Sequence, residues 1–306
     1  MVNGRCKLRL VVDPVAKRQF GVSTHLYHAQ RLTRDHLLEI AAHGFEAVEL
    51  FATRTHFDYH NVAAVADLQQ WLAEAGLALH GVHAPTSESY VGGRWGPPLS
   101  LASPDEDARV RAVDEAKTAL HVARRIPVKV LVAHLGVARA GASADAYTGA
   151  ADAKIRPDNR EAARRSIEEL QQDAAPLGVR VAVEVIPNEL SRAGSLVHFV
   201  EEDLEANEVG VCLDFGHAHM DGDLVDAIET VSGHLVTTHV HDNRGRIDDH
   251  LVPFEGTIDW PPALTAIQKI GYDDTLLLEI AAHGSPKETL KKAQKARERM
   301  ERLLAA

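Results

Sequence analysis

Short apolar runs rich in β-branched residues alternate with amphipathic stretches along nearly the whole chain. The runs are typical of buried strands, and they lie at residues 20–27, 45–51, 77–84, 128–135, 179–186, 209–213, 235–241 and 275–280. The stretches have helical periodicity, and they lie at residues 34–43, 62–75, 105–125, 158–175, 196–206, 223–231, 260–270 and 286–304. Strands that alternate with helices in this way, without a linker, predict an α/β protein built as one parallel, eight-stranded (β/α)8 barrel, the TIM barrel.

A doubly wound sheet is the alternative fold for such an alternation. That fold binds phosphate groups with a glycine-rich loop after its first strand. No such loop follows the first expected strand, because Gly21-Val22-Ser23-Thr24 lies inside the strand itself. We therefore expect an N-terminal tail over residues 1–18 and a single barrel domain over residues 19–306.

Charge and cysteine content limit the partners and the compartment. The formal net charge of -11 disfavours a protein whose affinity depends on many phosphate contacts, so we expect no nucleic-acid partner. No apolar run approaches the ~20 residues that cross a bilayer, which argues against a membrane partner. The two cysteines, Cys6 and Cys212, form no disulfide framework, as is typical of a reducing compartment. We expect a cytoplasmic protein that acts on a small molecule.

Acidic and imidazole side chains gather where the expected strands end. Because the carboxyl ends of barrel strands share one face, these side chains should lie close together. The candidates on this face are His83, His134, Glu184, Asp214, His217, His239, His241, Asp248, His250 and Glu279. Carboxylates and imidazoles fixed around one point form a binding site for a divalent metal ion.

Two of the glutamates interrupt strongly apolar runs. Glu184 lies in VAVEVI and Glu279 in TLLLEI. A buried carboxylate without a partner would be costly, so a bound cation is the simplest explanation for both. Asp214 and His217 follow the run Val209–Leu213, and they fit either a metal site or a helix N-cap followed by a surface histidine.

His239 and His241 alternate with Val240, so both imidazoles can face the barrel interior. One would then be a metal ligand and the other a substrate contact. Asp248 and His250 follow in the next loop, where an ordinary polar loop is the alternative interpretation.

These residues lie in stretches that resemble the xylose isomerase-like barrel superfamily, which holds sugar isomerases and epimerases, inosose dehydratases and endonuclease IV. The resemblance runs from about residue 20 to the C-terminus. It is carried by HVHDNRGRIDDHLVPFEGTIDW, by GYDDTLLLEI and by CLDFGHAH. In the isomerases and epimerases, one divalent ion is held by residues that match Glu184, Asp214, His239 and Glu279. The resemblance also makes His217 a substrate contact, with His241 as a rival to His239 for the metal.

Members similar to endonuclease IV bind three zinc ions. The additional ligands that this resemblance implies are His83, His134, His217, Asp248 and His250. The family's usual glycine in the loop before Glu255-Gly256 is replaced here by Phe254, which changes the expected shape of that loop.

The leading hypothesis is therefore a divalent-metal-dependent isomerase or epimerase of a sugar or a keto-polyol. Glu184 and Glu279 would move a proton at the carbon next to the carbonyl, while His217, His241 and Trp95 contact the substrate. The metal would be manganese, cobalt or magnesium in a mononuclear site and zinc in a multinuclear one. The alternatives are a trinuclear zinc phosphodiesterase similar to endonuclease IV and a keto-sugar dehydratase or lyase. Barrels of this family often pair, so a homo-oligomer is a further expectation.

Overall fold

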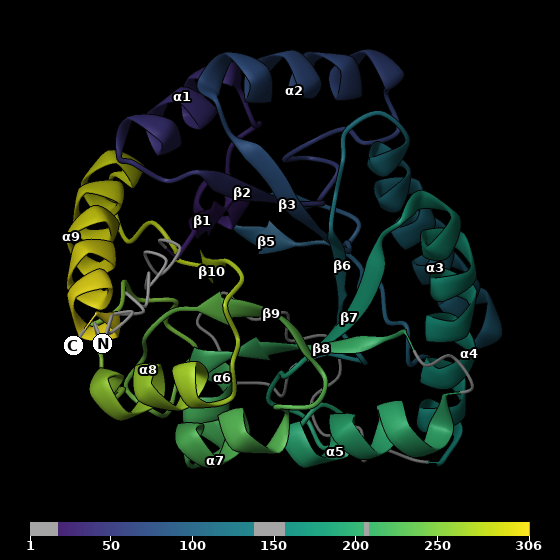
Figure 1. Cartoon of the computed structure of the whole chain (residues 1–306). Coiled ribbons are helices and arrows are strands. Elements are labelled where there is room, and N and C mark those ends of the chain that lie inside the picture. The colour runs from purple at the N-terminus through teal and green to yellow at the C-terminus, as the bar shows by residue number, and fades with distance from the viewer. Residues whose placement is uncertain (1–17, 138–156, 205–207, 306) are drawn as a thin grey trace, which may run out of the picture.

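Eight parallel strands close into a barrel in the computed structural model, which describes residues 18–137, 157–204 and 208–305. The strands are joined around the barrel in the order β1-β10-β9-β8-β7-β6-β3-β2 (Figure 1). Their bounds are β1 Phe20–Ser23, β2 Ala47–Phe51, β3 Ala78–His83, β6 Val130–Ala133, β7 Arg180–Glu184, β8 Gly210–Asp214, β9 Leu235–Val240 and β10 Leu276–Leu278. The predicted (β/α)8 barrel is confirmed. The expected tail at residues 1–18 lies almost wholly outside the described residues, and the domain boundary stays a prediction.

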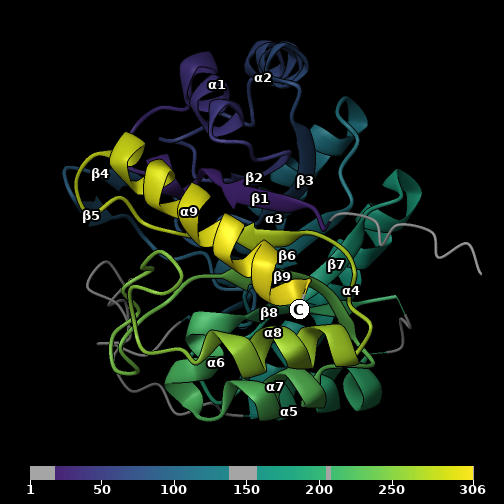
Figure 2. The same ribbon diagram turned by 60° about the vertical axis from the view of Figure 1, so that its left-hand side comes forward.

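Helices surround the barrel and cover the outward face of its strands (Figures 1 and 2). They are α1 Arg34–Ala42, α2 Val62–Ala75, α3 Glu106–Leu120, α4 Pro157–Ala174, α5 Ala193–His198, α6 Phe215–Asp221, α7 Leu224–Thr230, α8 Trp260–Lys269 and α9 Pro286–Leu304. In α9, Leu290, Ala293 and Met300 are buried, whereas the lysines face outward. None of the described helices is long and apolar enough to cross a membrane.

The connections that differ from the sequence pattern include those after β1 and after β3. The first expected strand ends at Ser23, because the Ser23 hydroxyl caps a 3-10 helix at Thr24–Tyr27 by accepting the His25 N–H at 3.3 Å. After β3, a hairpin that the pattern did not predict is formed by β4 (Tyr90–Val91) and β5 (Arg94–Trp95). The turn between its strands needs two residues with positive φ, which Gly92-Gly93 supplies.

Side chains alternate between the barrel interior and the helix layer along each strand. Val130, Val132, Ala182 and Cys212 form a small apolar cluster of their own inside the barrel, separate from the large core under the helices. Glu184 and Asp214 lie two residues beyond Ala182 and Cys212, so they face the same interior at its carboxyl end. Burial raises the pKa of the Cys212 thiol, which argues against thiolate chemistry there.

The loop after β9 is built around the buried carboxylate of Asp242. This carboxylate accepts hydrogen bonds from the backbone N–H groups of Asn243, Phe254 and Ile258 at 2.9, 2.9 and 3.2 Å, and from Trp260 Nε1 at 3.0 Å. A single side chain therefore holds together a loop that contains two candidate ligands, Asp248 and His250.

Phe254, at the position where the family resemblance predicts glycine, keeps the conformation that glycine favours. Its φ of 74° lies in the left-handed region, which costs about 1–2 kcal/mol for a residue with a side chain. Its ring contacts Trp260 at a centroid distance of 5.3 Å, and the Arg299 guanidinium lies 4.0 Å from its centroid. These contacts offset part of the backbone strain.

We predict that Asp242→Ala destabilises the protein by about 3 kcal/mol or more, because it leaves several buried N–H donors without an acceptor. Urea unfolding followed by circular dichroism measures this change. Asp67→Ala on the exposed side of α2 is the control and should alter the free energy of unfolding by less than about 0.5 kcal/mol. Equal stabilities for the two variants would contradict the role given to Asp242.

Candidate metal centre

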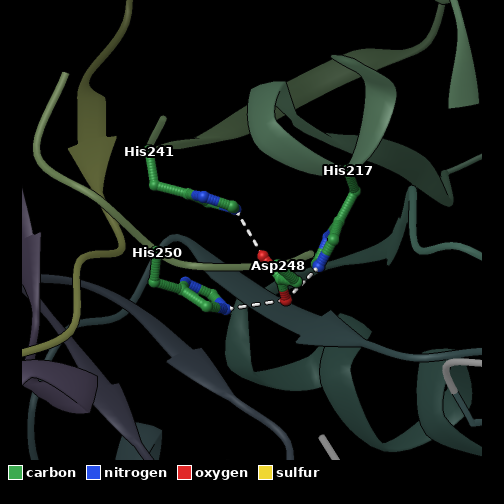
Figure 3. A group of neighbouring side chains, drawn as sticks. All are labelled: His217, His241, Asp248 and His250. Carbon is green, nitrogen blue, oxygen red and sulfur yellow. Dashed lines mark hydrogen bonds and ion pairs between the residues drawn. The ribbon is translucent and has the colours of Figure 1, made fainter. Parts of the chain in front are cut away.

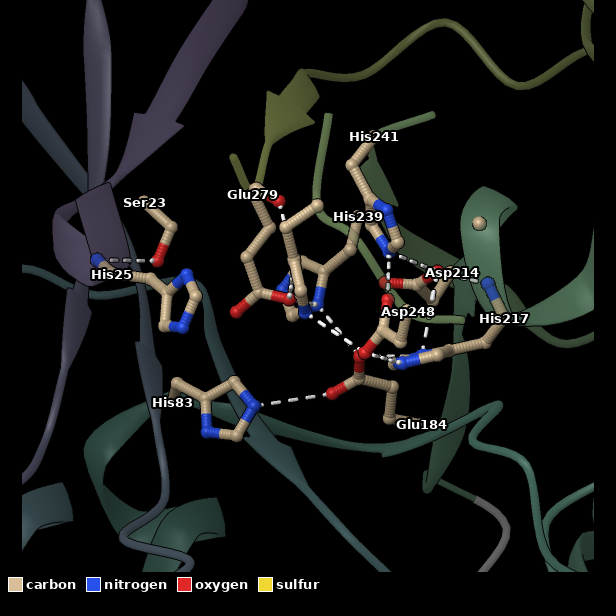
Figure 4. Close-up of polar contacts among 12 residues, drawn as sticks. Ser23, His25, His83, Glu184, Asp214, His217, His239, His241, Asp248 and Glu279 are labelled. Carbon is tan, nitrogen blue, oxygen red and sulfur yellow. Dashed lines mark hydrogen bonds and ion pairs between the residues drawn. The ribbon is translucent and has the colours of Figure 1, made fainter. Parts of the chain in front are cut away.

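Ten acidic and imidazole side chains meet at the carboxyl end of the barrel, and they include all nine predicted metal ligands. Figure 4 labels eight of them, all except His134 and His250. Three groups each place their donor atoms within 4.8 Å of one another. They are Glu184 with Asp214, His239 and Glu279; His83 with Glu184 and His239; and His217 with His241, Asp248 and His250. The structure thus brings together the residues that the sequence pattern selected, although their binding of metal stays a prediction.

The first group combines side chains of three adjacent strands with Glu279, which directly follows β10. His239 Nδ1 lies 2.8 Å from Glu184 Oε1 and 3.4 Å from Glu279 Oε2. Strand pairing sets Asp214 beside His239 in the register of β8 and β9. Asp214 Oδ1 accepts the His217 N–H at 2.7 Å as a helix N-cap, whereas the buried Oδ2 has no hydrogen-bond partner among the described residues. Asp214 therefore fits both of its interpretations, with one oxygen for the cap and one free for an ion.

Glu184 lies between two sets of histidines. Its Oε2 lies 3.2 Å from His83 Nε2 and 3.0 Å from His134 Nε2, while its Oε1 faces His239. Burial alone would raise the pKa of Glu184, but His239 and His134 hold it well below the usual value. A carboxylate whose two oxygens face different donor sets has the geometry needed to bridge two cations.

Asp248 is at the centre of the remaining group (Figure 3). Its Oδ2 lies 2.9 Å from His217 Nε2 and 3.0 Å from His250 Nε2, and its Oδ1 lies 3.5 Å from His241 Nε2. His241 Nε2 and Asp248 Oδ1 are buried without a hydrogen-bond partner in the described part of the chain. The structure places His241 among metal-type donors, whereas the sequence analysis made it a substrate contact, with a place as rival to His239 for the metal as the alternative. His239 and His241 fall in different donor groups, although His241 Nε2 also lies 3.0 Å from Asp214 Oδ1 of the first group.

Three of these histidines share one arrangement of their ring nitrogens. The Nδ1 of His83, His217 and His250 lies 2.8, 3.1 and 2.8 Å from the backbone carbonyl oxygens of Ala84, Val185 and Glu279. A carbonyl oxygen only accepts, so each Nδ1 carries the hydrogen and each Nε2 faces a carboxylate. An outer acceptor that directs the opposite nitrogen inward is the usual support of a metal-binding histidine.

The backbone is strained at His250 and tightly packed at Gly216, both next to the Asp248 group. His250 has a φ of 44°, which a residue with a side chain rarely adopts. Gly216 lies so close to His241 that an added Cβ would be 2.0 Å from its Cε1. A rare conformation and a glycine with no room for a side chain are both typical of a functional site.

Five carboxylates are buried here with no lysine or arginine beside them. Within the described residues, all of their ion pairs are with histidines; the five are Glu49, Glu184, Asp214, Asp248 and Glu279. Positive charge must come from protonated imidazoles or from metal ions, since buried carboxylates are otherwise costly. The unsatisfied atoms of Asp214, Asp248 and His241 show that the residues fit a bound cation.

Sequence analysis missed Glu49 of β2, which is fully buried. Its Oε2 lies 3.0 Å from His239 Nε2, and its Oε1 accepts the Ser23 hydroxyl at 3.0 Å. The signal that identified Glu184 and Glu279 was present, because Glu49 interrupts the apolar run AVELF in the same way.

Trp95, the predicted substrate contact from the loop after β3, is half-buried on the β4–β5 hairpin. Its ring stacks on His28 at a centroid distance of 5.5 Å and meets Phe51 at 6.1 Å. Phe51 in turn contacts His83 at 5.3 Å. Trp95 therefore belongs to an aromatic rim that adjoins the metal-type groups, and its substrate role stays a prediction.

Comparison with known proteins agrees with this architecture. The family model described as "Xylose isomerase-like TIM barrel" matches residues 37–305. The uncharacterized protein MJ1311 of Methanocaldococcus jannaschii is 27% identical over 273 residues, which span 87% of this chain and 84% of that protein. The crystal structure of a D-tagatose 3-epimerase-like protein has a TM-score of 0.74 at 23% identity, with 94% of this chain and 97% of that chain covered. The structure of IOLI protein with a bound zinc atom has a TM-score of 0.72 at 18% identity, with coverages of 92% and 98%.

We predict that the metal-free protein loses stability as the pH rises above neutrality. Burial lowers the pKa of His83, but the hydrogen bond and charge of Glu184 outweigh it and raise the pKa to about 9. Burial likewise lowers the pKa of His250, and Asp248 raises it to about 10. Both folded-state values exceed the unfolded value near 6.5, so this stabilisation is complete below about pH 6.5 and is lost between there and pH 9 to 10.

Thermal unfolding of chelator-treated protein between pH 6 and pH 10 tests this prediction. The free energy of unfolding is expected to fall by on the order of 3 kcal/mol from the titration of His83 alone. Metal-loaded protein is the matched control. A bound ion supplies the positive charge without protons, so its stability should change less with pH than that of the metal-free protein. A metal-free protein as stable at pH 9.5 as at pH 6.5 would rule out imidazolium compensation.

Proposed function

The chain belongs to the xylose isomerase-like TIM barrel family, and from this premise we propose that it is a divalent-metal-dependent isomerase or epimerase of a sugar or keto-polyol. The observation that carries the proposal is the first donor group, Glu184 with Asp214, His239 and Glu279, at the carboxyl end of the barrel. The unpartnered Oδ2 of Asp214 and the excess of negative charge in the site support the binding of a cation there. Similarity to a D-tagatose 3-epimerase-like protein supports the substrate class.

These four side chains would hold the ion. When bound, a divalent cation polarises the carbonyl group of a ketone and makes the neighbouring C–H bond acidic. The four residues come from β7, β8, β9 and the position after β10, so they would hold the substrate above the barrel with the C–H next to its carbonyl group toward the two glutamates.

Glu279 is the better placed of the two proposed proton carriers. Its side chain contacts only His239 and His250, at 3.4 and 4.0 Å, and no hydrogen bond to its carboxylate occurs in the described residues. We assign it the removal of the proton next to the carbonyl, because one of its oxygens is free to accept. Glu184 has histidines on both sides and would return a proton to the substrate after taking one from a neighbouring imidazolium, His83 or His134.

His217 and the aromatic rim would complete the substrate site. His217 Nε2 faces the interior beside Asp248, and Trp95 provides an apolar surface next to Phe51. A ring of this kind suits the C–H face of a sugar. A keto-sugar dehydratase or lyase would share the proton removal and differ only in the bond that breaks next, so analysis of the products distinguishes these reactions.

A trinuclear zinc phosphodiesterase is the second candidate, and the bridging geometry of Glu184 favours it. The histidines His83 and His134 on one side of Glu184 and the Asp248 group on the other add two further sets of donors. Clustered cations would stabilise negative charge on a phosphoryl group.

We predict that Glu279→Gln lowers kcat on the active ketose or inosose by about 10²–10⁴-fold, because an amide cannot accept the proton. Steady-state assays across a panel of ketoses and inososes measure this. Glu255→Gln is the matched control, since Glu255 is exposed on the loop after β9 and pairs with Lys292 at 2.9 Å. Full activity of Glu279→Gln would remove Glu279 from the mechanism.

Elemental analysis of the untagged protein separates the two candidates. About one manganese, cobalt or magnesium per chain is expected for the isomerase, whereas two or three zinc ions with cleavage of abasic DNA would favour the phosphodiesterase. Protein that contains no metal and takes up none on addition would contradict both.

A further inference from the structure

Glu49 is a buried carboxylate that belongs to none of the three donor groups. Its side chain is fully inaccessible to solvent on β2, and its contacts in the described structure are Ser23 on one oxygen and His239 on the other. Such a group is costly to bury, and among the described residues its one ion pair is with His239, not with a lysine or an arginine. Its position therefore calls for an explanation that the proposed reaction does not supply.

The two ring nitrogens of His239 face opposite ways. Nδ1 points to the ion pocket, 2.8 Å from Glu184 Oε1 and 3.4 Å from Glu279 Oε2. Nε2 points away from it, 3.0 Å from Glu49 Oε2. An imidazole gives a metal ion one nitrogen, so the other nitrogen carries a hydrogen and needs an acceptor.

His239 differs from its neighbours in the nature of that acceptor. His83, His217 and His250 direct their outer nitrogen to a neutral backbone carbonyl. The outer nitrogen of His239, Nε2, instead lies next to the negatively charged carboxylate of Glu49. A carboxylate acceptor makes the opposite nitrogen a stronger electron donor than a carbonyl acceptor does.

We propose that Glu49 is the positioning residue of the metal centre, holding His239 with Nδ1 toward the ion and strengthening it as a ligand. The inference rests on the metal role that the proposed function gives to His239. Glu49 acts through His239 and touches neither the ion nor the substrate.

The register of β1 and β2 holds the Glu49 carboxylate in place beside His239. Ser23 and Glu49 are direct partners in the pairing of β1 with β2, so the Ser23 hydroxyl reaches Oε1 and restrains rotation of the carboxylate. Gly81 on β3 lies beside it, and a Cβ at that position would be in van der Waals contact with Glu49 Oε2 at 3.4 Å. Three neighbouring strands thus shape one position for this side chain.

Chelator titration of the zinc-loaded protein, with the zinc that remains per chain as the readout, tests the proposal. For Glu49→Ala, we expect one ion per chain to bind about 10–100-fold more weakly than in the wild type. Glu49→Gln keeps an oxygen that can accept from Nε2 but loses the charge, so we expect a smaller loss of at least about threefold.

Glu115→Ala is the matched control. Glu115, on α3, also accepts from a histidine, His60 Nε2 at 2.9 Å, and from the Tyr59 hydroxyl at 2.6 Å. Its hydrogen bonds within the described residues involve no member of the three donor groups, so its removal should leave zinc affinity unchanged. Thermal unfolding of each metal-free variant shows that it is folded. If Glu49→Ala does not fold, the zinc affinity of Glu49→Gln alone tests the proposal.

Affinity of Glu49→Gln within twofold of the wild type overturns the proposal, and so does an equal loss in Glu115→Ala. A wild-type protein that binds no metal would instead remove the proposed function. The two failures are therefore distinguishable.

Discussion

Burial of five carboxylates at one end of the barrel is the constraint on which the rest of the structure depends. Within the described residues their ion pairs are with histidines alone, so the negative charge is balanced by imidazolium protons or by cations. Two buried atoms, Asp214 Oδ2 and Asp248 Oδ1, have no hydrogen-bond partner in this part of the chain. An arrangement that leaves acceptors unsatisfied in a low-dielectric interior is costly for folding and useful for binding a metal ion.

The barrel provides the scaffold that makes this arrangement possible. Neighbouring strands in register bring their last inward-facing residues to one level, as Asp214 and His239 show. Small side chains such as Ala182 fill the interior beneath them, while the large apolar residues face the helices. The loop after β9 adds the candidate ligands Asp248 and His250, and its shape depends on the hydrogen bonds of Asp242 and on the left-handed conformations of His250 and Phe254.

Three glutamates interrupt apolar strands, and the contacts of each suit a different task. Glu184 has both oxygens occupied by histidines and lies between two donor sets. Glu279 has few contacts and an oxygen free for substrate chemistry. Glu49 lies behind His239, where it supports a ligand without reaching the pocket. We therefore propose three different tasks for the same residue type, a bridge, a proton carrier and a support, because contacts and not identity determine how freely each carboxylate can react.

The sequence by itself determined the barrel and selected nearly all of the acidic and imidazole side chains that the structure brings together at its carboxyl end. Alternation of apolar runs with amphipathic stretches predicts the fold, and a single carboxylate inside an apolar run marks a buried charge, because both patterns are local along the chain. Only the tertiary structure assigned His239 and His241 to different groups, gave Asp214 both a capping oxygen and a free one, and set Glu49 behind His239. Which way a ring nitrogen points depends on the register of neighbouring strands and on acceptors such as Val185 or Glu49 that are distant in sequence. A one-dimensional pattern contains no information on those distances.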